Sequence, residues 1–391
     1  MSQRLINRSP DLKRLRDEGY EVEIRGGFLV LGHVPYVTPD RRVDFGELVS
    51  ELTLAGDATQ APSSHVAMFR GQTPCDHLGA PLNRILIGSG HQVVAAGVEI
   101  DHTFSSKPPS GHYPDYYVKM TTYLAILGQY AESLDSEATA TTFKPLVNID
   151  SDGVFKYVDT ASSRAGIAAI TARLETGPVA IVGLGGTGAY ILDLVAKTPV
   201  REIHLWDGDR FYQHNAFRTP GAASLTSLEG KPYKVDYFAA IYSQIRGGIV
   251  GHAEFVSESN LGQLSGSDFV FLALDASEAK RLIVHHLEDK QIPFIDVGMG
   301  IHEVAGSLGG LLRVTTSSGK DDEPASRRIS SSGGQQDEYA SNIQIADLNA
   351  LNAALAVVRW KKLLGFYSDL ENEHHTTYQI DGNEITNEDR W

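Results

Sequence analysis

The stretch PVAIVGLGGTGAYILDLVAKTPVREIHLWDGD, residues 178–209, contains a strand, a glycine-rich turn, a helix and a second strand. An apolar run over residues 179–182 precedes the turn, and apolar residues at helical spacing follow it as far as Val195. A second strand-like run, residues 202–206, ends at Asp207. This order predicts a βαβ unit, the building block of an α/β domain with a parallel sheet.

The turn of this unit is shaped by four glycines, Gly183, Gly185, Gly186 and Gly188. Glycine lets the backbone approach a phosphate group closely, and the amides at the start of the following helix face that anion. A carboxylate at the end of the second strand, here Asp207, can bind a ribose hydroxyl. The unit therefore predicts a nucleotide site, although a turn that only packs a strand on a helix has the same local pattern.

Length and composition limit the class of protein. The 391 residues allow about two or three domains. The single cysteine, Cys75, excludes an intrachain disulfide framework and a cysteine-rich zinc site. No N-terminal apolar stretch has the length of a signal peptide or membrane span, so we expect a cytoplasmic protein. The formal net charge of −15 opposes nonspecific binding to nucleic acid or to an anionic membrane, so proteins or small molecules are the expected partners.

Residues 1–150 predict a separate N-terminal α+β domain. A short polar helix over residues 11–16 precedes two strand-like runs, which are joined by Gly26 and Gly27 as in a hairpin. We expect further short strands over residues 45–54, 65–70, 83–87 and 92–100, and then a long helix over residues 113–134. The composition changes to Ser, Thr, Ala and Glu near residues 136–142, which is typical of a linker or an exposed loop.

Reactive side chains gather in the second half of this domain: Cys75, Asp76, His77, His91, Asp101, His102 and His112. Such groups could bind zinc, or His77 could polarise Cys75 as a nucleophile. Their spacing matches no tight metal-binding pattern, so structural or surface histidines are the competing interpretation. The hydroxyls of Ser105 and Ser106, beside His102 and Lys107, offer a second kind of nucleophile. The sequence alone assigns no role to this domain.

The α/β pattern continues in the second half of the chain. We expect a helix over residues 161–174, capped by Ser162 or Ser163, directly before the nucleotide-binding strand. Another helix begins near Lys234, and further strands cover residues 269–274 and 293–297. Asp275 follows the first of these strands, and acids at strand ends are where an open α/β sheet places its ligand contacts.

Several features of this region occur in a fixed order: the GLGGTG turn, Asp207 and Asp209, the Asn-x-x-Arg of Asn215 and Arg218, Lys234 and Asp275. With this order and spacing, residues 161–365 resemble the ThiF/MoeB superfamily, the ATP-dependent adenylating fold shared with ubiquitin-activating enzymes. The resemblance implies a Rossmann-like adenylation domain, which we expect over residues 161–391.

The resemblance also implies which residues bind ATP and Mg2+, the expected cofactors. Asp207 would hold the ribose, Arg218 and Lys234 the triphosphate, and Asp275 would help to hold Mg2+. Asp209 and Asn215 belong to the same nucleotide-binding set. Attack of a carboxylate on the α-phosphate gives an acyl-adenylate, and the charge that develops requires cations placed beforehand. Seen singly, Arg218 and Lys234 could be surface cations and Asp275 a helix cap.

In this superfamily the substrate is typically the C-terminal glycine of a ubiquitin-like protein, and an extra fused domain resembles bacterial conjugation systems. Members that form a thioester often carry a cysteine after the last strand named above. Residues 301–339 contain none, and the paired CxxC zinc motifs of many relatives are absent. We therefore expect the acyl group to pass to a conjugating-enzyme-like partner, or to a nucleophile elsewhere, with Cys75 and Ser105 as candidates.

The C-terminal part predicts a loop, a helix and a hairpin. Residues 315–336 have the composition of a disordered loop that could order over bound substrate. A long apolar helix within residues 339–364 ends at Gly365, and residues 378–385 have a strand, turn, strand pattern that could pair with a second subunit. Together with the family resemblance, this helix predicts a homodimer in which Arg164 reaches the partner's nucleotide.

Two other functions compete with adenylation. Gly183, Gly185, Gly188 and Asp207 also satisfy the fingerprint of an NAD-dependent oxidoreductase. A dehydrogenase, however, has no evident need for the later Asn-x-x-Arg, lysine and aspartate in that order. The other alternative is a catalytically silent scaffold that keeps the fold and binds a ubiquitin-like partner. Thermal stabilisation by ATP with Mg2+, by NAD, or by neither separates the three.

Overall fold

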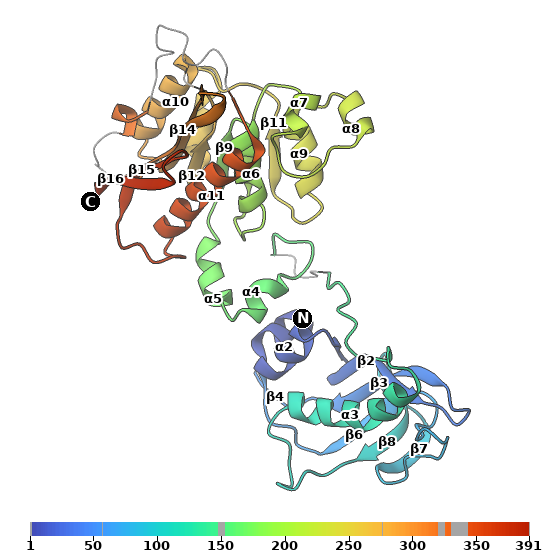
Figure 1. Cartoon of the computed structure of the whole chain (residues 1–391). Coiled ribbons are helices and arrows are strands. Elements are labelled where there is room, and N and C mark those ends of the chain that lie inside the picture. Colours follow the sequence, from blue (N-terminus) through green and yellow to red (C-terminus); the bar gives the residue numbers. More distant parts are fainter. Residues whose placement is uncertain are drawn as a thin grey trace. The chain divides into compact units, whose positions relative to one another are not determined.

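The computed structural model describes residues 2–56, 58–147, 153–275, 277–319, 325–329 and 343–390. The chain forms two compact units, Met1–Asp152 and Gly153–Trp391 (Figure 1). None of the helices in the described part of the chain combines the length and the apolar character needed to cross a bilayer.

The N-terminal unit is built on one antiparallel sheet with the strand order β1-β2-β3-β6-β8-β7. The strands are β1 (Glu21–Arg25), β2 (Phe28–Val37), β3 (Val43–Glu51), β6 (Val66–Arg70), β7 (Leu86–Ala95) and β8 (Val98–Ser105). A short pair, β4 (Leu54–Ala55) and β5 (Ala58–Thr59), stands apart. The helices are α1 (Ser2–Arg8), α2 (Pro10–Asp17) and α3 (Tyr116–Leu134).

Helix α3 covers one face of this sheet. Asp115 caps it by accepting a hydrogen bond from the Val118 amide, and Tyr116, Met120 and Tyr123 follow at helical spacing on its buried side. These side chains pack with alternate residues of the strands into one apolar core. The N-terminal domain is therefore a mostly strand-built α+β layer of sheet and helices.

The structure corrects part of the strand pattern expected for this unit. The hairpin at Gly26 and Gly27 is confirmed, and both glycines have positive φ angles. The single strand expected over residues 92–100 is wrong, because the chain turns at Gly97, where φ is +71°. The residues before this turn belong to β7 and those after it to β8, which pair with each other.

The second unit contains an eight-stranded mixed sheet with the order β11-β10-β9-β12-β13-β14-β15-β16. Its strands are β9 (Val179–Val182), β10 (Ile203–Trp206), β11 (Ile249–His252), β12 (Phe269–Leu272), β13 (Phe294–Val304), β14 (Ser307–Ser317), β15 (Glu373–Gln379) and β16 (Glu384–Arg390). Strands β9 to β13 are parallel, and the rest of the sheet is antiparallel.

Helices cover both faces of this sheet, as Figure 1 shows for α6, α10 and α11. They are α4 (Thr160–Arg164), α5 (Ala168–Thr171), α6 (Gly186–Val195), α7 (Gln213–Ala216), α8 (Leu225–Glu229), α9 (Lys234–Tyr242), α10 (Glu278–Asp289) and α11 (Ala346–Leu363), with short 3-10 turns η1 (Ala172–Leu174), η2 (Leu261–Gly266) and η3 (Ala325–Arg327). Val179 and Ile181 pack with α6, α9 and α11, whereas Ala180 and Val182 pack with α10 on the other face. The fully apolar strand β9 thus lies at the centre of a Rossmann-type α/β domain.

Two expectations for this unit are wrong in detail. The helix expected over residues 161–174 is broken at Gly166, where φ is +69°, and its first segment is capped by Asp159 instead of Ser162 or Ser163. The loop expected over residues 315–336 begins later, because residues 315–317 belong to β14. Residues 320–324 and 330–336 of that expected loop lie outside the described residues.

The C-terminal segments are used inside the unit. The hairpin is confirmed, and its strand β15 pairs with β14 of the same chain. The apolar side of α11, with Ala353, Ala356 and Trp360, is buried in the core beside α6 and β13. The apolar character of this helix is therefore explained without a second subunit.

Candidate functional site

The glycine turn connects β9 to α6 at the carboxyl end of the parallel strands. Gly183 has φ +89°, a conformation that favours glycine, and a side chain there would collide with the Ala273 carbonyl. A Cβ atom at Gly188 would collide with the Gly183 carbonyl, and one at Gly186 with the Asn349 side chain. These three glycines are required by close packing within the protein itself.

Gly185 differs from the other three glycines. Its φ angle is −69°, which any residue can adopt, and the nearest atom to a Cβ placed there would be the Gln344 Oε1, 4.0 Å away. That oxygen is buried, and none of the described residues donates a hydrogen bond to it. Among the described residues, the turn therefore leaves room for a Cβ atom at Gly185, which would make only an ordinary van der Waals contact with this unused acceptor.

Asp207 follows β10 and lies next to the turn. Its Oδ2 accepts a hydrogen bond from the Leu184 amide at 2.7 Å, and its Oδ1 accepts one from the Asp209 amide at 2.8 Å. The Lys234 ammonium, on the first residue of α9, lies 3.3 Å from both oxygens of Asp207 and 2.7 Å from Asp209 Oδ2. Asp207 and Lys234 are both buried, whereas Asp209 is largely exposed. The carboxylate of Asp207 thus accepts four hydrogen bonds from three donor groups.

Asn215 and Arg218 lie on and just after α7. The Asn215 Oδ1 accepts a hydrogen bond from the Tyr212 amide at 2.8 Å and so stabilises the N-terminus of the short helix. The Asn215 Nδ2 and the Arg218 Nε are buried, and no acceptor for them exists among the described residues. Buried donors without acceptors are unfavourable, so this pair has unused capacity for an anionic or polar ligand.

A residue that the sequence did not single out links these parts. Asn349 on α11 is fully buried; its Oδ1 accepts a hydrogen bond from the Thr187 hydroxyl at 3.0 Å, and its Nδ2 donates one to the Arg218 carbonyl at 3.2 Å. One amide side chain therefore holds the glycine turn and the Arg218 loop together. Its signal in the sequence is a pair of asparagines, Asn349 and Asn352, three apart on a mostly apolar helix.

Asp275 follows β12 in the loop that leads to α10. The alternative role of a helix cap is excluded, because α10 begins at Glu278 and is capped by Ser277. The buried Lys280 donates a hydrogen bond to the Leu274 carbonyl at 3.1 Å and pairs with the fully buried Asp296. The Asp275 loop is thus anchored by a buried lysine on the following helix.

These residues suit a nucleotide triphosphate. The parallel strands β9, β10 and β12 bring the glycine turn, Asp207 and Asp275 to one edge of the sheet. Lys234 and Arg218 would supply positive charge for phosphates. No group of three metal-ligating side chains exists among the described residues, so Asp275 would hold Mg2+ as one protein ligand, with phosphate and water oxygens as the others.

Arg164 and the N-terminal candidates lie elsewhere. Arg164 is the exposed last residue of α4, and its contact with a partner's nucleotide stays a prediction. Cys75 is buried, and its thiol donates a hydrogen bond to the Thr73 carbonyl. Burial, and then the Asp76 carboxylate, raises the pKa of Cys75, which opposes a nucleophilic role. His77, expected to polarise it, stacks on Tyr130 instead.

Three histidines of the N-terminal unit contact polar side chains. The His91 Nδ1 lies 3.0 Å from Asp101 Oδ1, and the His102 Nδ1 lies 3.0 Å from the Ser89 hydroxyl. Ser105 has a different base from the one expected, because its hydroxyl lies 3.1 Å from the His65 Nε2. The expected alternative of a zinc site finds no cluster of three ligands in the described residues.

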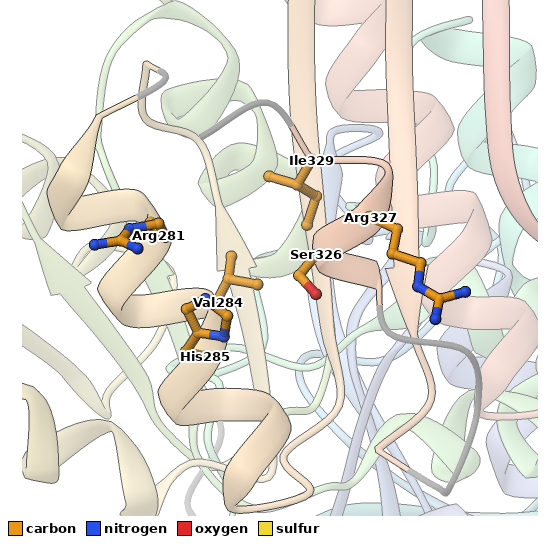
Figure 2. Close-up of a pocket in the computed structure, with 6 residues that line it drawn as sticks. All are labelled: Arg281, Val284, His285, Ser326, Arg327 and Ile329. Carbon is orange, nitrogen blue, oxygen red and sulfur yellow. The ribbon is translucent and has the colours of Figure 1, made fainter. Parts of the chain in front are cut away.

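A separate surface pocket lies on the α10 side of the second unit. Figure 2 shows its lining by Arg281, Val284 and His285 of α10 and by the segment Ser326, Arg327 and Ile329. Arg281 pairs with Glu278 on the same helix. None of the residues predicted from the sequence lines this pocket.

Comparison with known proteins adds two family matches. A model of the ThiF family matches residues 136–389, more than half of the chain, and one described as a domain of unknown function (DUF6791) matches residues 10–160. No curated protein matches the chain.

Solved structures to which the chain is similar include the E. coli protein MccB with MccA-N7isoASN, at 16% identity and a TM-score of 0.43 over 59% of this chain and 69% of that one. PaaA is similar at 19% identity and a TM-score of 0.44 over 57% of this chain and 76% of that one. E. coli MccB with ATP matches at 16% identity and a TM-score of 0.43, with 59% and 71% covered.

Proposed function

The chain belongs to the ThiF family, and we propose that it uses ATP to adenylate a carboxylate. The observation that carries this proposal is the arrangement at the sheet edge: an uncrowded backbone at Gly185, a buried acid and lysine beside it, and an arginine with an unused donor. An acid, two cations and an unobstructed glycine backbone are the groups that a nucleotide triphosphate requires.

The contacts of Lys234 indicate how nucleotide would bind. Lys234 neutralises Asp207 and Asp209. Because each oxygen of Asp207 already accepts two hydrogen bonds, a ribose hydroxyl must replace one of the three donor groups. Among these donors from the described residues, the Lys234 ammonium is the one that is not a backbone amide. In the proposed complex Lys234 turns from Asp207 to the phosphates, and the ribose hydroxyl takes its place.

The reaction then needs charge stabilisation more than covalent chemistry. The carboxylate oxygen attacks the α-phosphate, the bond to the β-phosphate breaks, and pyrophosphate leaves. Lys234 and Arg218 would stabilise the charge on the phosphates, while Mg2+ held by Asp275 would neutralise the leaving group. Asn349 would keep the Arg218 loop and the glycine turn at a fixed separation during this step.

The proposed substrate is the C-terminal carboxylate of a ubiquitin-like protein, in a bacterial type of conjugation, with a conjugating-enzyme-like protein as acyl acceptor. The proposed assembly is a homodimer in which Arg164 reaches the partner's nucleotide. The family match gives the oxidoreductase alternative no support. A silent scaffold stays as the alternative that an activity measurement must exclude.

Exchange of labelled pyrophosphate into ATP tests the adenylation directly. We expect exchange that depends on the ubiquitin-like partner, and thermal stabilisation by ATP with Mg2+ but not by NAD. Lys234→Met should lower the exchange rate by about 100-fold to 1,000-fold, the usual loss for one preorganised charge-stabilising donor. Lys197→Met, which removes an exposed lysine paired with Asp193, is the matched control and should exchange normally. Normal exchange in Lys234→Met, or none in the wild-type chain, would count against the proposal.

Arg218→Ala and Asp275→Ala should suppress exchange while the fold is retained.

Light scattering under assay conditions tests the assembly. A monomer with full exchange activity would exclude a dimer-dependent site, whereas a dimer whose exchange falls in Arg164→Ala would support it.

A further inference from the structure

Ser89 occupies an unusual position at the edge of the N-terminal sheet. It lies on β7, the last strand of that sheet, between Gly88 and Gly90. Gly90 has a φ angle of +151°, and a Cβ atom there would meet nothing within 4 Å. The serine is exposed and stands between two residues that carry no side chain.

The hydroxyl of Ser89 is hydrogen-bonded to a buried histidine. The Ser89 Oγ lies 3.0 Å from the Nδ1 of His102, which is 6% exposed and is stacked on Phe104. Burial lowers the pKa of His102, against the opposing effects of Asp101 and of a hydrogen bond with the Gly71 backbone. The imidazole is therefore mainly neutral at neutral pH. A neutral imidazole whose position is fixed by packing and by a second hydrogen bond is the usual partner of a nucleophilic serine.

We propose that Ser89 is an acyl-accepting nucleophile and that His102 is its general base. The Ser89 Oγ attacks the carbonyl carbon of an activated acyl group and forms an oxyester, while its proton passes to the His102 Nδ1. The bond from the carbonyl carbon to the leaving oxygen breaks. With an acyl-adenylate as donor, the leaving group is AMP, and the His102 proton is then released to water. The identity of this donor rests on the proposed adenylation, but the nucleophile does not.

The strand irregularity beside Ser89 supports this chemistry. The pairing of β7 with β8 goes from Ser89 opposite His102 to Gln92 opposite Ile100, so Gly90 and His91 together face one residue. Such a bulge re-aims the backbone and is common next to active sites. In this proposal the backbone amides of the bulge would stabilise the oxyanion that forms on the acyl carbonyl.

Ser105 is the natural comparison within the same unit. It also contacts a histidine, His65, but it is less exposed than Ser89 and is not flanked by glycines. His91 and Asp101, the other titratable groups near Ser89, are paired with each other, and the Gly71 amide donates a second hydrogen bond to that carboxylate. Because His91 and Asp101 are engaged with each other, we assign the role of base for Ser89 to His102.

A fluorophosphonate probe on the full chain tests the nucleophile without ATP. We expect covalent labelling that peptide mass spectrometry places on Ser89, that Ser89→Ala abolishes and that Ser105→Ala leaves unchanged. The labelling rate should rise with pH through an apparent pKa below 6.5, the ordinary value for histidine, because His102 must be neutral to act. His102→Gln should slow labelling by about 100-fold or more. Absence of labelling, or labelling that persists in Ser89→Ala, would overturn the proposal even if His102→Gln fails to fold.

The donor is tested separately with ATP, Mg2+ and the ubiquitin-like partner. An adduct that resists thiol, is released by hydroxide and is lost in Ser89→Ala identifies Ser89 as the acceptor. Pyrophosphate exchange without such an adduct would overturn the acyl-adenylate as the donor for Ser89. Probe labelling without exchange would instead refute the adenylation and leave the nucleophile in place.

Discussion

Gly185 provides the sharpest test of where nucleotide binds. Three glycines of the turn are packed against protein atoms, whereas a Cβ atom at Gly185 would make one ordinary van der Waals contact among the described residues, with the Gln344 Oε1 at 4.0 Å. A methyl group at this position therefore does not disturb the protein, but it occupies the space in which we expect the nucleotide. The variant Gly185→Ala should separate folding from binding.

The expected magnitudes follow from this geometry. The φ angle of −69° is favourable for alanine, so the free energy of unfolding without nucleotide should change by less than about 0.5 kcal/mol. A methyl group forced into an occupied site costs about 1–3 kcal/mol. The affinity for ATP should therefore fall by about 5-fold to 150-fold. Gly188→Ala is the contrasting variant, because its side chain collides with the Gly183 carbonyl and should destabilise the unit itself.

Calorimetric titration of ATP with Mg2+, together with thermal unfolding of the nucleotide-free protein, measures both quantities. We expect Gly185→Ala to keep the wild-type melting temperature and to bind ATP weakly. Gly188→Ala should lower the melting temperature by about 2–4 °C for each kcal/mol lost. Wild-type affinity in Gly185→Ala would refute the placement of nucleotide over this glycine. A lowered melting temperature in the same variant would show that the space is needed by the protein.

Two further predictions concern buried polar groups. Burial lowers the pKa of Lys119 from 10.5 to about 8, so the unfolded chain binds more protons between these values and stability should rise with pH from about 8 to 10.5. The gain, about 3 kcal/mol in urea unfolding of the wild type, should be absent in Lys119→Met; equal pH profiles would contradict it. Asn349→Ala should destabilise the second unit by about 1–3 kcal/mol and weaken ATP binding, because the Arg218 carbonyl loses its donor and the turn loses its link to α11. Unchanged ATP affinity in a destabilised Asn349→Ala would limit its role to folding.

Much of the site was predictable because its parts are local. The glycine turn, Asp207 and Asp275 each stand at the end of an apolar strand, and parallel strands bring their carboxyl ends to one edge. Lys234 was predictable from its position in the family pattern, but its pairing with Asp207 was not. That contact depends on the packing of α9 on β11 and on the hydrogen bond from the Lys234 amide to the Asp209 carbonyl, which no short sequence pattern encodes.

The remaining features depend on register or on distant segments. Asn349 lies 162 residues from the Thr187 hydroxyl that it binds, so only the packing of α11 on α6 reveals its role. The Ser89–His102 pair needs the register of β7 against β8, and an expected strand over residues 92–100 hides the turn that creates it. The break at Gly166 has a local cause instead, because this one residue with a positive φ angle divides an otherwise helical pattern.

Lys234 also leads to a prediction that distinguishes ATP from adenosine. Lys234 and a ribose hydroxyl would compete for Asp207, and a Lys234 displaced from this buried carboxylate would keep only its contact with the exposed Asp209, which is unfavourable for a buried lysine. ATP can satisfy both partners, since its ribose binds Asp207 while its phosphates bind Lys234, but adenosine can replace only one of them. Removal of the lysine in Lys234→Met should therefore lower the affinity for ATP and raise the affinity for adenosine. The same substitution thus has opposite effects on the two ligands. Asp207 keeps its two backbone donors in this variant, which should preserve the turn. Calorimetric titration of both ligands against both proteins measures the four affinities. If Lys234→Met lowers the affinities for adenosine and ATP together, Lys234 serves only to position Asp207. Lys234 then does not turn from Asp207 to the phosphates when ATP binds.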